Sequence, residues 1–225
     1  MKSPYQKNFT KQGYLMNYEK LLPYLNEKNW VMQFHVKLNE IEPPIWRRIQ
    51  VPYDYNFWDL HVAIQDAMGW LDYHMHHFEF PRKGKRSRVL IGIPDFHQTG
   101  ELDEVFPGWE ISVKSYFKTL GVESIYEYDY GDGWLHTVKL EGYMFREKGV
   151  KYPRCIDGAR ACPPEDCGGV YGYENLLKII SDTSDPEFED MRTWLGPKWQ
   201  PELFNKDDVK FDNPYKRWQN AFLKD

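Results

Sequence analysis

The sequence predicts an α+β fold: a mainly antiparallel sheet built from hairpins with one central helix, followed by a helical C-terminal part packed on it. Two observations lead to this prediction. Alternating apolar and polar positions, the period of half-buried strands, dominate the first two thirds of the chain, and apolar positions at helical spacing dominate the last third. Aromatic residues make up 17% of the 225 residues, so a large core is feasible.

The chain divides into three segments. Residues 1–29 are polar and are expected to form a peripheral N-terminal extension, in which the leucines around Pro23 could make a short helix. Residues 30–205 are expected to form a single α+β domain, and residues 206–225 a C-terminal helical tail. The sequence shows no internal repeat and no low-complexity tract.

The domain is expected to begin with a hairpin. The segment WVMQFHVKLN (30–39) alternates apolar and polar residues, Pro43 and Pro44 make the turn, and IWRRIQV (45–51) returns as the second strand. Arg47 and Arg48 are neighbours on that strand, so their side chains point to opposite faces. One of them is expected to pair with a carboxylate, for which the acidic segment PPEDCGG is a candidate source.

A helix is expected over 57–68, opened by Tyr55 or Asn56, and Gly69 ends it. The other expected elements are strands over 74–80 and 88–93, an exposed loop over 94–111, a short helix over 113–120, a hairpin of 125–130 and 134–143, and helices over 173–181, 186–195 and 214–223. The segment YPRCIDGARACPPEDCGG (152–169) is rich in Pro, Gly and charge, which favours a loop.

Charge and hydropathy exclude several classes of protein. The net charge of −5 argues against a protein that coats nucleic acid with its whole surface. No apolar run approaches the ~18 residues of a membrane span, and the N-terminus lacks the apolar centre of a signal peptide. We therefore expect a cytoplasmic protein without membrane association, in which the odd number of cysteines, three, stay reduced or bind metal.

Several blocks of the chain resemble the plasmid pRiA4b open-reading-frame-3-like family, over roughly residues 30–205. The blocks are IEPPIWRRIQVP (41–52), GW (69–70), HMHHFEF (74–80), YDYGDGWLH (128–136) and YPRCIDGARACPPEDCGGVYGYENLL (152–177). The resemblance implies a compact α+β domain of the prokaryotic cytoplasm or of mobile elements, since members are also described as insertion-element passengers with a resolvase-like label. It implies no defined reaction, and the chain lacks the Ser–Arg site and the basic helix-turn-helix of a serine recombinase.

The chain departs from the pattern of the family at two places. Members usually carry a single His-x-His followed by an acidic residue, whereas here His74 and His76 are followed by His77. Members often have a short Gly-rich hairpin tip, whereas this chain has the basic run RKGKRSR (82–88).

The hairpin YEYDYGDGWLH offers the first candidate site. If Asp132-Gly133 forms a two-residue type I′ turn, Asp129 faces His136 across the strands, and the carboxylate fixes the tautomer of the imidazole. A metal ligand or a general base needs such a pair. The alternative is that Asp129 and His136 simply tie the hairpin together.

The histidines of HMHHFEF offer the second candidate site. On a strand, His74 and His76 share a face with two phenylalanines, while His77 points the other way and is expected to be exposed. Together with Asp129 or His136 the two imidazoles could bind a metal ion, which makes His74, His76, Asp129 and His136 the candidate catalytic residues. Hydrogen-bonded core histidines beside aromatic residues are the alternative.

The cysteines offer the third candidate site. Cys155, Cys162 and Cys167 could complete a tetrahedral zinc site with one histidine, although their spacing differs from that of zinc knuckles. His136 is the first candidate for this fourth ligand, and His74 and His76 are the alternatives. A redox pair and a nucleophilic thiol near His136 are further alternatives. The remaining interpretation is that three small residues are buried in a loop braced by prolines. A chemical role requires the loop to fold back onto the 129–136 hairpin.

The basic run offers the last candidate site, a surface for nucleic acid or for an acidic partner. Its five cations are Arg82, Lys83, Lys85, Arg86 and Arg88. A solvated hairpin tip protected by charge explains them as well.

The residues favour a non-enzymatic binding or adaptor module, for which a protein partner and a structural zinc ion are possible, and the family resemblance implies an association with mobile elements. A metal-dependent or Cys/His-based enzyme near the GDGW hairpin is the alternative, and a nucleic-acid-binding accessory protein is the second alternative.

Overall fold

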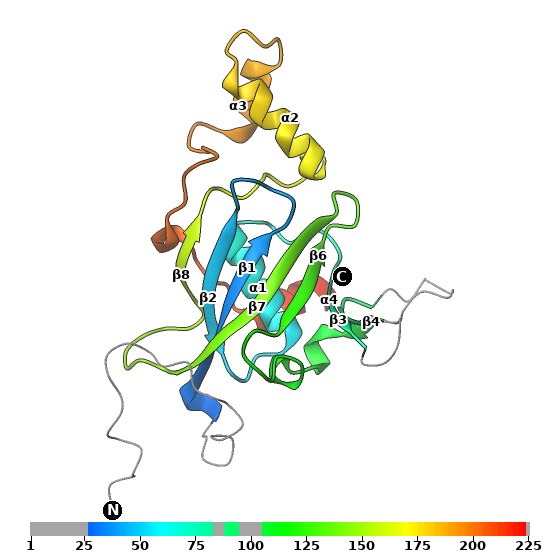
Figure 1. Ribbon diagram of the computed structural model, residues 1–225, viewed down its shortest axis with the longest axis vertical. Helices are drawn as coiled ribbons and strands as arrows, with labels where there is room; N and C mark the ends of the chain where they lie inside the picture. Colours follow the sequence, from blue (N-terminus) through cyan, green and yellow to red (C-terminus); the bar gives the residue numbers. More distant parts are fainter. Residues whose placement is uncertain (1–26, 83–87, 95–104, 224–225) are drawn as a thin grey trace, which may run out of the picture.

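The computed structural model describes residues 27–82, 88–94 and 105–223 (Figure 1). The short helix expected around Pro23, most of the expected loop 94–111 and the tip of the basic hairpin lie outside the described residues. The described residues form a mixed sheet with helices, so the prediction of an α+β fold is confirmed.

The sheet has eight strands in the order β5-β4-β3-β6-β7-β1-β2-β8. The strands are β1 (Trp30–Leu38), β2 (Trp46–Pro52), β3 (His76–Pro81), β4 (Arg88–Gly92), β5 (Val105–Pro107), β6 (Glu123–Tyr128), β7 (Trp134–Phe145) and β8 (Arg154–Ala159). The α-helices are α1 (Phe57–Met68), α2 (Gly169–Ser181), α3 (Phe188–Leu195) and α4 (Pro214–Phe222).

Neighbouring strands are antiparallel, except that β4 and β5 run parallel. Strand β1 pairs with β2 on one side and β7 on the other, so that Val36 lies between Arg47 and Val138. The residues of β1 expected to face the core, Met32, Phe34, Val36 and Leu38, are all buried. The alternating pattern read from the sequence is therefore the one that this strand uses.

Helix α1 packs across the sheet and supplies much of the core. Asn56 caps it, because its side chain accepts from the Asp59 N–H at 2.8 Å while the Asp59 carboxylate accepts from the Asn56 N–H. Gly69 ends it in the left-handed conformation with φ 91°. The ring of Phe57 contacts those of Phe78 and Phe80 on β3, so the face of β3 that carries these phenylalanines packs on α1.

The other side of α1 is covered by the C-terminal helix α4. The indole N–H of Trp58 donates to the carbonyl of Pro214 at 2.9 Å, and Arg217 pairs with Asp66 at 2.6 Å. Helices α2 and α3 lie beyond one end of the sheet (Figure 1). Helix α2 joins the core through Tyr173 and Leu176, both buried.

Some local predictions differ from the structure. Within the segment expected as a loop, Arg154–Ala159 forms strand β8, because the exposed backbone of β2 provides hydrogen-bonding partners for it. The helix expected over 113–120 is a single 3-10 turn, Val113–Ser115. The end of the loop expected over 94–111 contains β5, which pairs with β4. No helix among the described residues is long and apolar enough to cross a membrane.

Candidate functional site

The three cysteines lie on strand β8 and in the loop that follows it. Cys155 is on strand β8, where its thiol donates to the backbone carbonyl of Asp157 at 3.3 Å. The carboxylate of Asp157 accepts from the N–H of Gly158 at 2.9 Å. Cys162 is buried and Cys167 half-buried in the loop that follows, and all three are free thiols. Within the described part of the chain, no cluster of three or more potential ligand atoms includes a cysteine or His136. The zinc set Cys155, Cys162, Cys167 and His136 thus stays a prediction.

Two of the thiols, those of Cys155 and Cys162, lie near a buried arginine. Arg47 is 2% exposed, and its guanidinium donates to the carbonyls of Ala67, Trp46 and Ala159 at 2.8–2.9 Å. Burial lowers the pKa of Arg47, while the nearby Cys162 and Cys155 act in the opposite direction. Arg48, on the other face of β2, pairs with Glu141 at 2.7 Å. The expected carboxylate partner therefore lies on β7 and not in the acidic segment PPEDCGG.

Burial also determines the protonation of the thiols. It raises the pKa of Cys155 and of Cys162, and it raises the pKa of Cys167 to about 12. Nucleophilic cysteines have a lowered pKa, because the thiolate is the reactive form. The apo protein therefore holds these thiols protonated at neutral pH, which disfavours the nucleophilic alternative.

The cysteine loop does fold back onto the β6–β7 hairpin, as a chemical role would require. The N–H of Gly168 donates to the Asp132 carboxylate at 3.2 Å, and the hydroxyl of Tyr128 donates to Glu165 at 2.5 Å. The other oxygen of Glu165 accepts from the N–H of Leu71 at 2.8 Å. The loop thereby joins the hairpin to the segment that follows α1.

The pairing of Asp129 with His136 was predicted in the wrong register. In the sheet His136 is paired with Tyr126, and Tyr128 with Trp134, so residues 129–133 form a longer loop than the predicted type I′ turn. Asp129 begins this loop with φ 59°, and its Oδ1 accepts from the N–H of Gly131 at 2.9 Å. An Asp side chain that binds the backbone in this way favours the wider turn. His136 is buried, and desolvation lowers its pKa to about 4.

The histidines of HMHHFEF are also arranged differently from the prediction. His74 precedes β3, and His77 is 9% exposed, because its ring contacts Tyr130 and its Nδ1 bonds to that hydroxyl at 2.9 Å. The expectation of an exposed His77 is therefore wrong. His76 is buried against α1, where burial lowers its pKa well below the usual value.

His76 belongs to a buried polar cluster with His61 of α1 and Asp72. His61 bonds to the Tyr126 hydroxyl at 2.8 Å and to Asp72 at 2.7 Å, so both of its ring nitrogens are used. The rings of His61 and His76 stack at 3.4 Å with an interplanar angle of 7°. A metal ion binds in the plane of an imidazole, and two parallel planes share no such position. His61 is therefore a hydrogen-bonded residue of the core, whereas the buried Nδ1 of His76 has no hydrogen-bond partner in the described part of the chain.

A second cluster brings together His74, Asp129 and Asp166. Nε2 of His74 lies 3.2 Å from Oδ1 of Asp166 and 3.6 Å from Oδ2 of Asp129. One ligand atom from each residue lies within 4.8 Å of the others. Asp129 is buried, whereas the side chain of Asp166 is 71% exposed. The structure thus unites two predicted candidate residues, His74 and Asp129, with a carboxylate from the cysteine loop.

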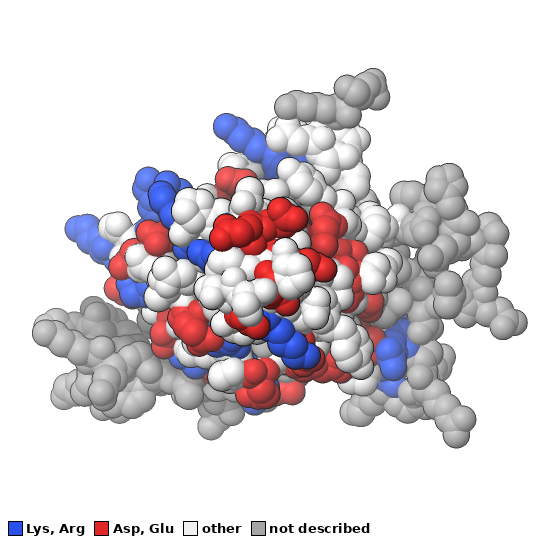
Figure 2. All heavy atoms as spheres, turned by 90° about the horizontal axis from the view of Figure 1, so that it is seen from above, with Lys and Arg blue, Asp and Glu red and all other residues white. Residues whose placement is uncertain are grey.

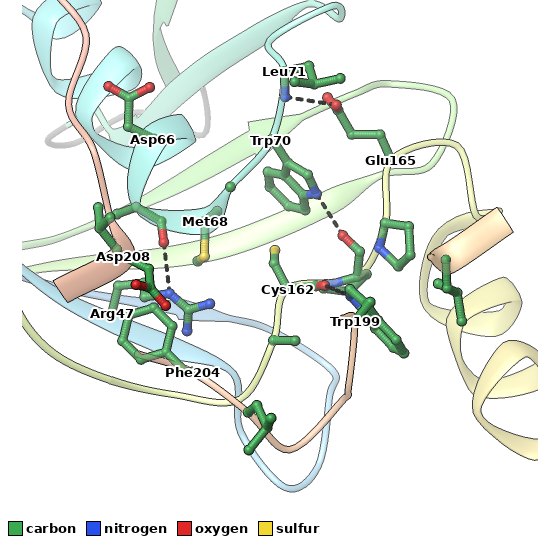
Figure 3. A pocket seen from close by; sticks show the side chains of 18 of the residues that line it. Arg47, Asp66, Met68, Trp70, Leu71, Cys162, Glu165, Trp199, Phe204 and Asp208 are labelled. Atoms are coloured by element: carbon green, nitrogen blue, oxygen red, sulfur yellow. Dashed lines mark hydrogen bonds between the residues drawn. The ribbon is translucent and has the colours of Figure 1, made fainter. Parts of the chain in front are cut away.

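A groove of about 650 Å³ reaches this cluster at Asp166, and Figure 3 shows other residues that line it. Four segments enclose it: the end of α1 with residues 69–73, the cysteine loop, the end of α3, and residues 203–210. Figure 3 shows Trp70, whose indole N–H donates to the carbonyl of Pro163 at 2.9 Å, next to Cys162, and Phe204 over the guanidinium of Arg47. The Phe204 ring centre is 3.7 Å from the Arg47 carbon. Asp166 lines this groove as well.

Of the five cations of the basic run, the structure describes Arg82 and Arg88. Lys83, Lys85 and Arg86 lie outside the described residues, and Arg82 is exposed. Arg88 pairs with Glu79 across the hairpin at 2.6 Å. Its use for nucleic acid stays a prediction.

Comparison with known proteins agrees with the resemblance seen in the sequence. The family model described as "Plasmid pRiA4b ORF-3-like protein" matches residues 30–208. The chain belongs to this family. An uncharacterised protein of Sinorhizobium fredii, y4hQ, is 32% identical over 167 residues, which are 74% of this chain and 81% of that protein.

A solved crystal structure has a similar fold. The crystal structure of MM3350, a protein of unknown function from Methanosarcina mazei Go1, is 40% identical and superposes with a TM-score of 0.71. The match covers 81% of this chain and 99% of that one. The family match of the pRiA4b model includes His74, Asp129, Asp166 and most of the groove, and it ends before α4.

Sequence reasoning missed His61, Asp72, Asp166 and the groove. His61 lies within the helical pattern of α1, and Asp166 was noted only as part of an acidic segment. The left-handed backbone of Asp72 (φ 64°) and Asp166 (φ 58°) follows from the fold and leaves no mark in the sequence. The one signal available was the folding of the cysteine loop onto the hairpin, which would have brought its acidic residues near His74.

Proposed function

We propose that this protein is a binding module whose groove takes a basic peptide segment of a partner protein, with an apolar side chain seated among the aromatic residues. The observation that carries the proposal is the gathering of exposed apolar side chains. Leu71, Tyr73, Trp194 and Leu203 are each at least 50% exposed, and all four line the groove. Exposed apolar groups that gather at one place mark interaction sites, whereas scattered ones need no explanation.

The charge of the groove indicates the kind of partner. Four carboxylates line it, those of Asp66, Glu165, Asp166 and Asp208, against two cations, Arg47 and Lys210. One of these charges is already neutralised, because Asp66 pairs with Arg217, while the guanidinium of Arg47 binds buried carbonyls. The remaining charges are three acidic and two basic, and one of the two cations, Arg47, is buried, so the groove complements a basic segment.

The openness of the rim favours a peptide over a small molecule. Tyr73 is 73% and Leu71 64% exposed, so the side chains at the rim of the groove are in contact with solvent. Small-molecule sites usually bury most of the ligand surface, whereas a peptide can be held by a few anchors at an open groove. Trp194 and Tyr73 are of the residue types that most often supply binding energy at interfaces.

A pair of charge-reversed probes tests the proposal. The first is a fluorescein-labelled peptide of alternating Lys and Leu with one Trp, and the second replaces each Lys by Glu. Fluorescence anisotropy should show binding of the basic peptide that weakens with salt, and little binding of the acidic one. Equal binding of both would contradict the role of the carboxylates, and binding of neither would contradict the peptide groove.

Two alanine variants locate the binding. Trp194→Ala, in the groove, should lower the affinity for the basic peptide about fivefold or more, which corresponds to a loss of about 1 kcal/mol of binding free energy. Tyr171→Ala is the matched control, because Tyr171 is 86% exposed and is not among the residues that line the groove. An equal effect of the two variants would place the peptide elsewhere.

The alternative functions have less support. Of the four residues predicted for a metal-dependent enzyme, only His74 and Asp129 share a cluster of ligand atoms among the described residues. The association with mobile elements follows from the family resemblance alone and is kept as a prediction.

A further inference from the structure

We propose that His74, Asp129 and Asp166 bind a divalent transition-metal ion, with zinc as the ion to test. The site joins three parts of the chain: the segment before β3, the β6–β7 loop and the cysteine loop. It differs from the predicted zinc set, because it uses an imidazole and two carboxylates instead of thiolates. It does not depend on the peptide groove, although Asp166 also lines that groove.

The two separations between His74 and the carboxylates fit a metal ion. Zinc lies about 2.0–2.1 Å from nitrogen and oxygen ligands, so two ligands of a tetrahedral site are about 3.3–3.4 Å apart. Nε2 of His74 lies 3.2 Å from Asp166 and 3.6 Å from Asp129, on either side of that value. A metal ion could therefore bind with little movement of these side chains.

The imidazole nitrogen has no other partner. Nε2 of His74 is buried and makes no hydrogen bond, although an Asp166 oxygen lies within hydrogen-bonding distance. The oxygen must then lie off the direction in which Nε2 could donate. A nitrogen that faces two carboxylates without bonding to either is arranged as a metal ligand would be.

Acidic charge around the site is not balanced by cations. Glu165 lies beside the site, because it accepts from the hydroxyl of Tyr128, whose ring packs against His74. Asp132 lies beside it as well, because its carboxylate accepts from the N–H of Gly168, two residues after Asp166. Among the ion pairs of the described residues, none joins a lysine or an arginine to these two carboxylates, to Asp129 or to Asp166. Figure 2 looks down on the molecule from the end that carries α2 and α3, and it shows acidic side chains over much of that face. A bound cation would offset this charge.

The site is supported by bonds to its ligands. Oδ1 of Asp129 accepts from the N–H groups of Gly131 at 2.9 Å and Asp132 at 3.3 Å, which leaves Oδ2 directed at His74. The ring of His74 packs edge-on against Tyr128 with centroids 5.8 Å apart. Such supporting contacts orient ligands before the metal binds.

Three protein ligands leave a fourth position for water or for a donor atom from outside the chain. The metal would also fasten the cysteine loop to the β6–β7 hairpin, because Asp166 and Asp129 lie on these two segments. Imidazole favours zinc over magnesium, which prefers oxygen ligands and retains its water.

Isothermal titration of the full chain with zinc, after treatment with chelator and dialysis, tests the site. We expect one ion per chain, no comparable binding of magnesium, and a higher melting temperature with zinc. Asp166→Asn and His74→Ala should each weaken zinc binding by about tenfold or more, since even the loss of a supporting contact costs about that much. Asp166 is exposed, so its variant should fold.

The matched controls are His35→Ala and Asp190→Asn, an imidazole on β1 and an exposed carboxylate on α3, which should leave zinc binding unchanged. Absence of zinc binding to the wild-type chain would overturn the proposal. So would unchanged affinity in Asp166→Asn combined with loss in Cys155→Ser or Cys167→Ser, because zinc would then be held by the thiols.

Discussion

The contact between the cysteine loop and the β6–β7 hairpin can be tested at two adjacent glycines. Gly168 and Gly169 both have left-handed backbones, with φ 88° and 66°. A Cβ added at Gly169 would lie 2.4 Å from the carbonyl oxygen of Asp132, whereas one at Gly168 would meet nothing closer than the Gly172 Cα at 3.5 Å. The two positions share the backbone requirement and differ in the space around them.

The expected costs follow from this difference. An alanine in the left-handed conformation costs about 1–2 kcal/mol, so Gly168→Ala should lower the free energy of unfolding by about that amount. Gly169→Ala carries the same cost, and its Cβ must also push the loop away from Asp132. Overpacking of a tight contact costs about 1–3 kcal/mol more, which gives about 2–5 kcal/mol in total.

Urea denaturation followed by tryptophan fluorescence measures both variants. The midpoint should fall further for Gly169→Ala than for Gly168→Ala, at an unchanged denaturant slope. If the two variants lose the same free energy of unfolding, the loop does not rest on the hairpin at Asp132 as the structure has it.

Two further predictions concern titrating groups. The pKa of His136 in the folded state is about 4, below the usual value near 6.5, because burial opposes its charge. Its contribution to stability is therefore complete above about pH 6.5 and is lost as the pH falls toward 4, by about 3 kcal/mol. Urea denaturation from pH 7 to 4 should show a smaller loss in His136→Gln than in wild type, and parallel curves would contradict the assignment. Burial likewise raises the pKa of the three thiols, so a thiol reagent such as Ellman's should react slowly with the native protein at pH 7.5 and with all three cysteines in guanidinium. Rapid reaction of any cysteine in the native protein would show that its thiol is activated.

The elements with a strong local pattern could be predicted from the sequence. Strand β1 alternates cleanly, and α1 carries its cap at Asn56 and its stop at Gly69. Strand β8 carries Pro, Gly and charge at or beside its ends and could not be recognised. It forms because β2 offers an unpaired edge, which is a property of the assembled sheet.

The site was predicted in part, because its residues come from separate segments. His74 and Asp129 were named, but Asp129 was paired with His136 by assuming the shortest turn, whereas the Asp129 side chain instead bonds to the backbone of its own loop. Asp166 reaches His74 only because the cysteine loop folds back. The groove lies between four segments that no local pattern connects.

The edge strand β8 limits how a partner can bind. Two of its backbone groups are already engaged within the strand, because the Cys155 thiol donates to the carbonyl of Asp157 and the Asp157 carboxylate accepts from the N–H of Gly158. Phe204 lies so close to Gly158 that a Cβ there would meet its ring at 2.4 Å. A partner that extends the sheet by strand addition needs a free row of such groups. Strand addition is therefore hindered at Asp157 and Gly158, and the Cys155 thiol is part of what occupies this edge of the sheet.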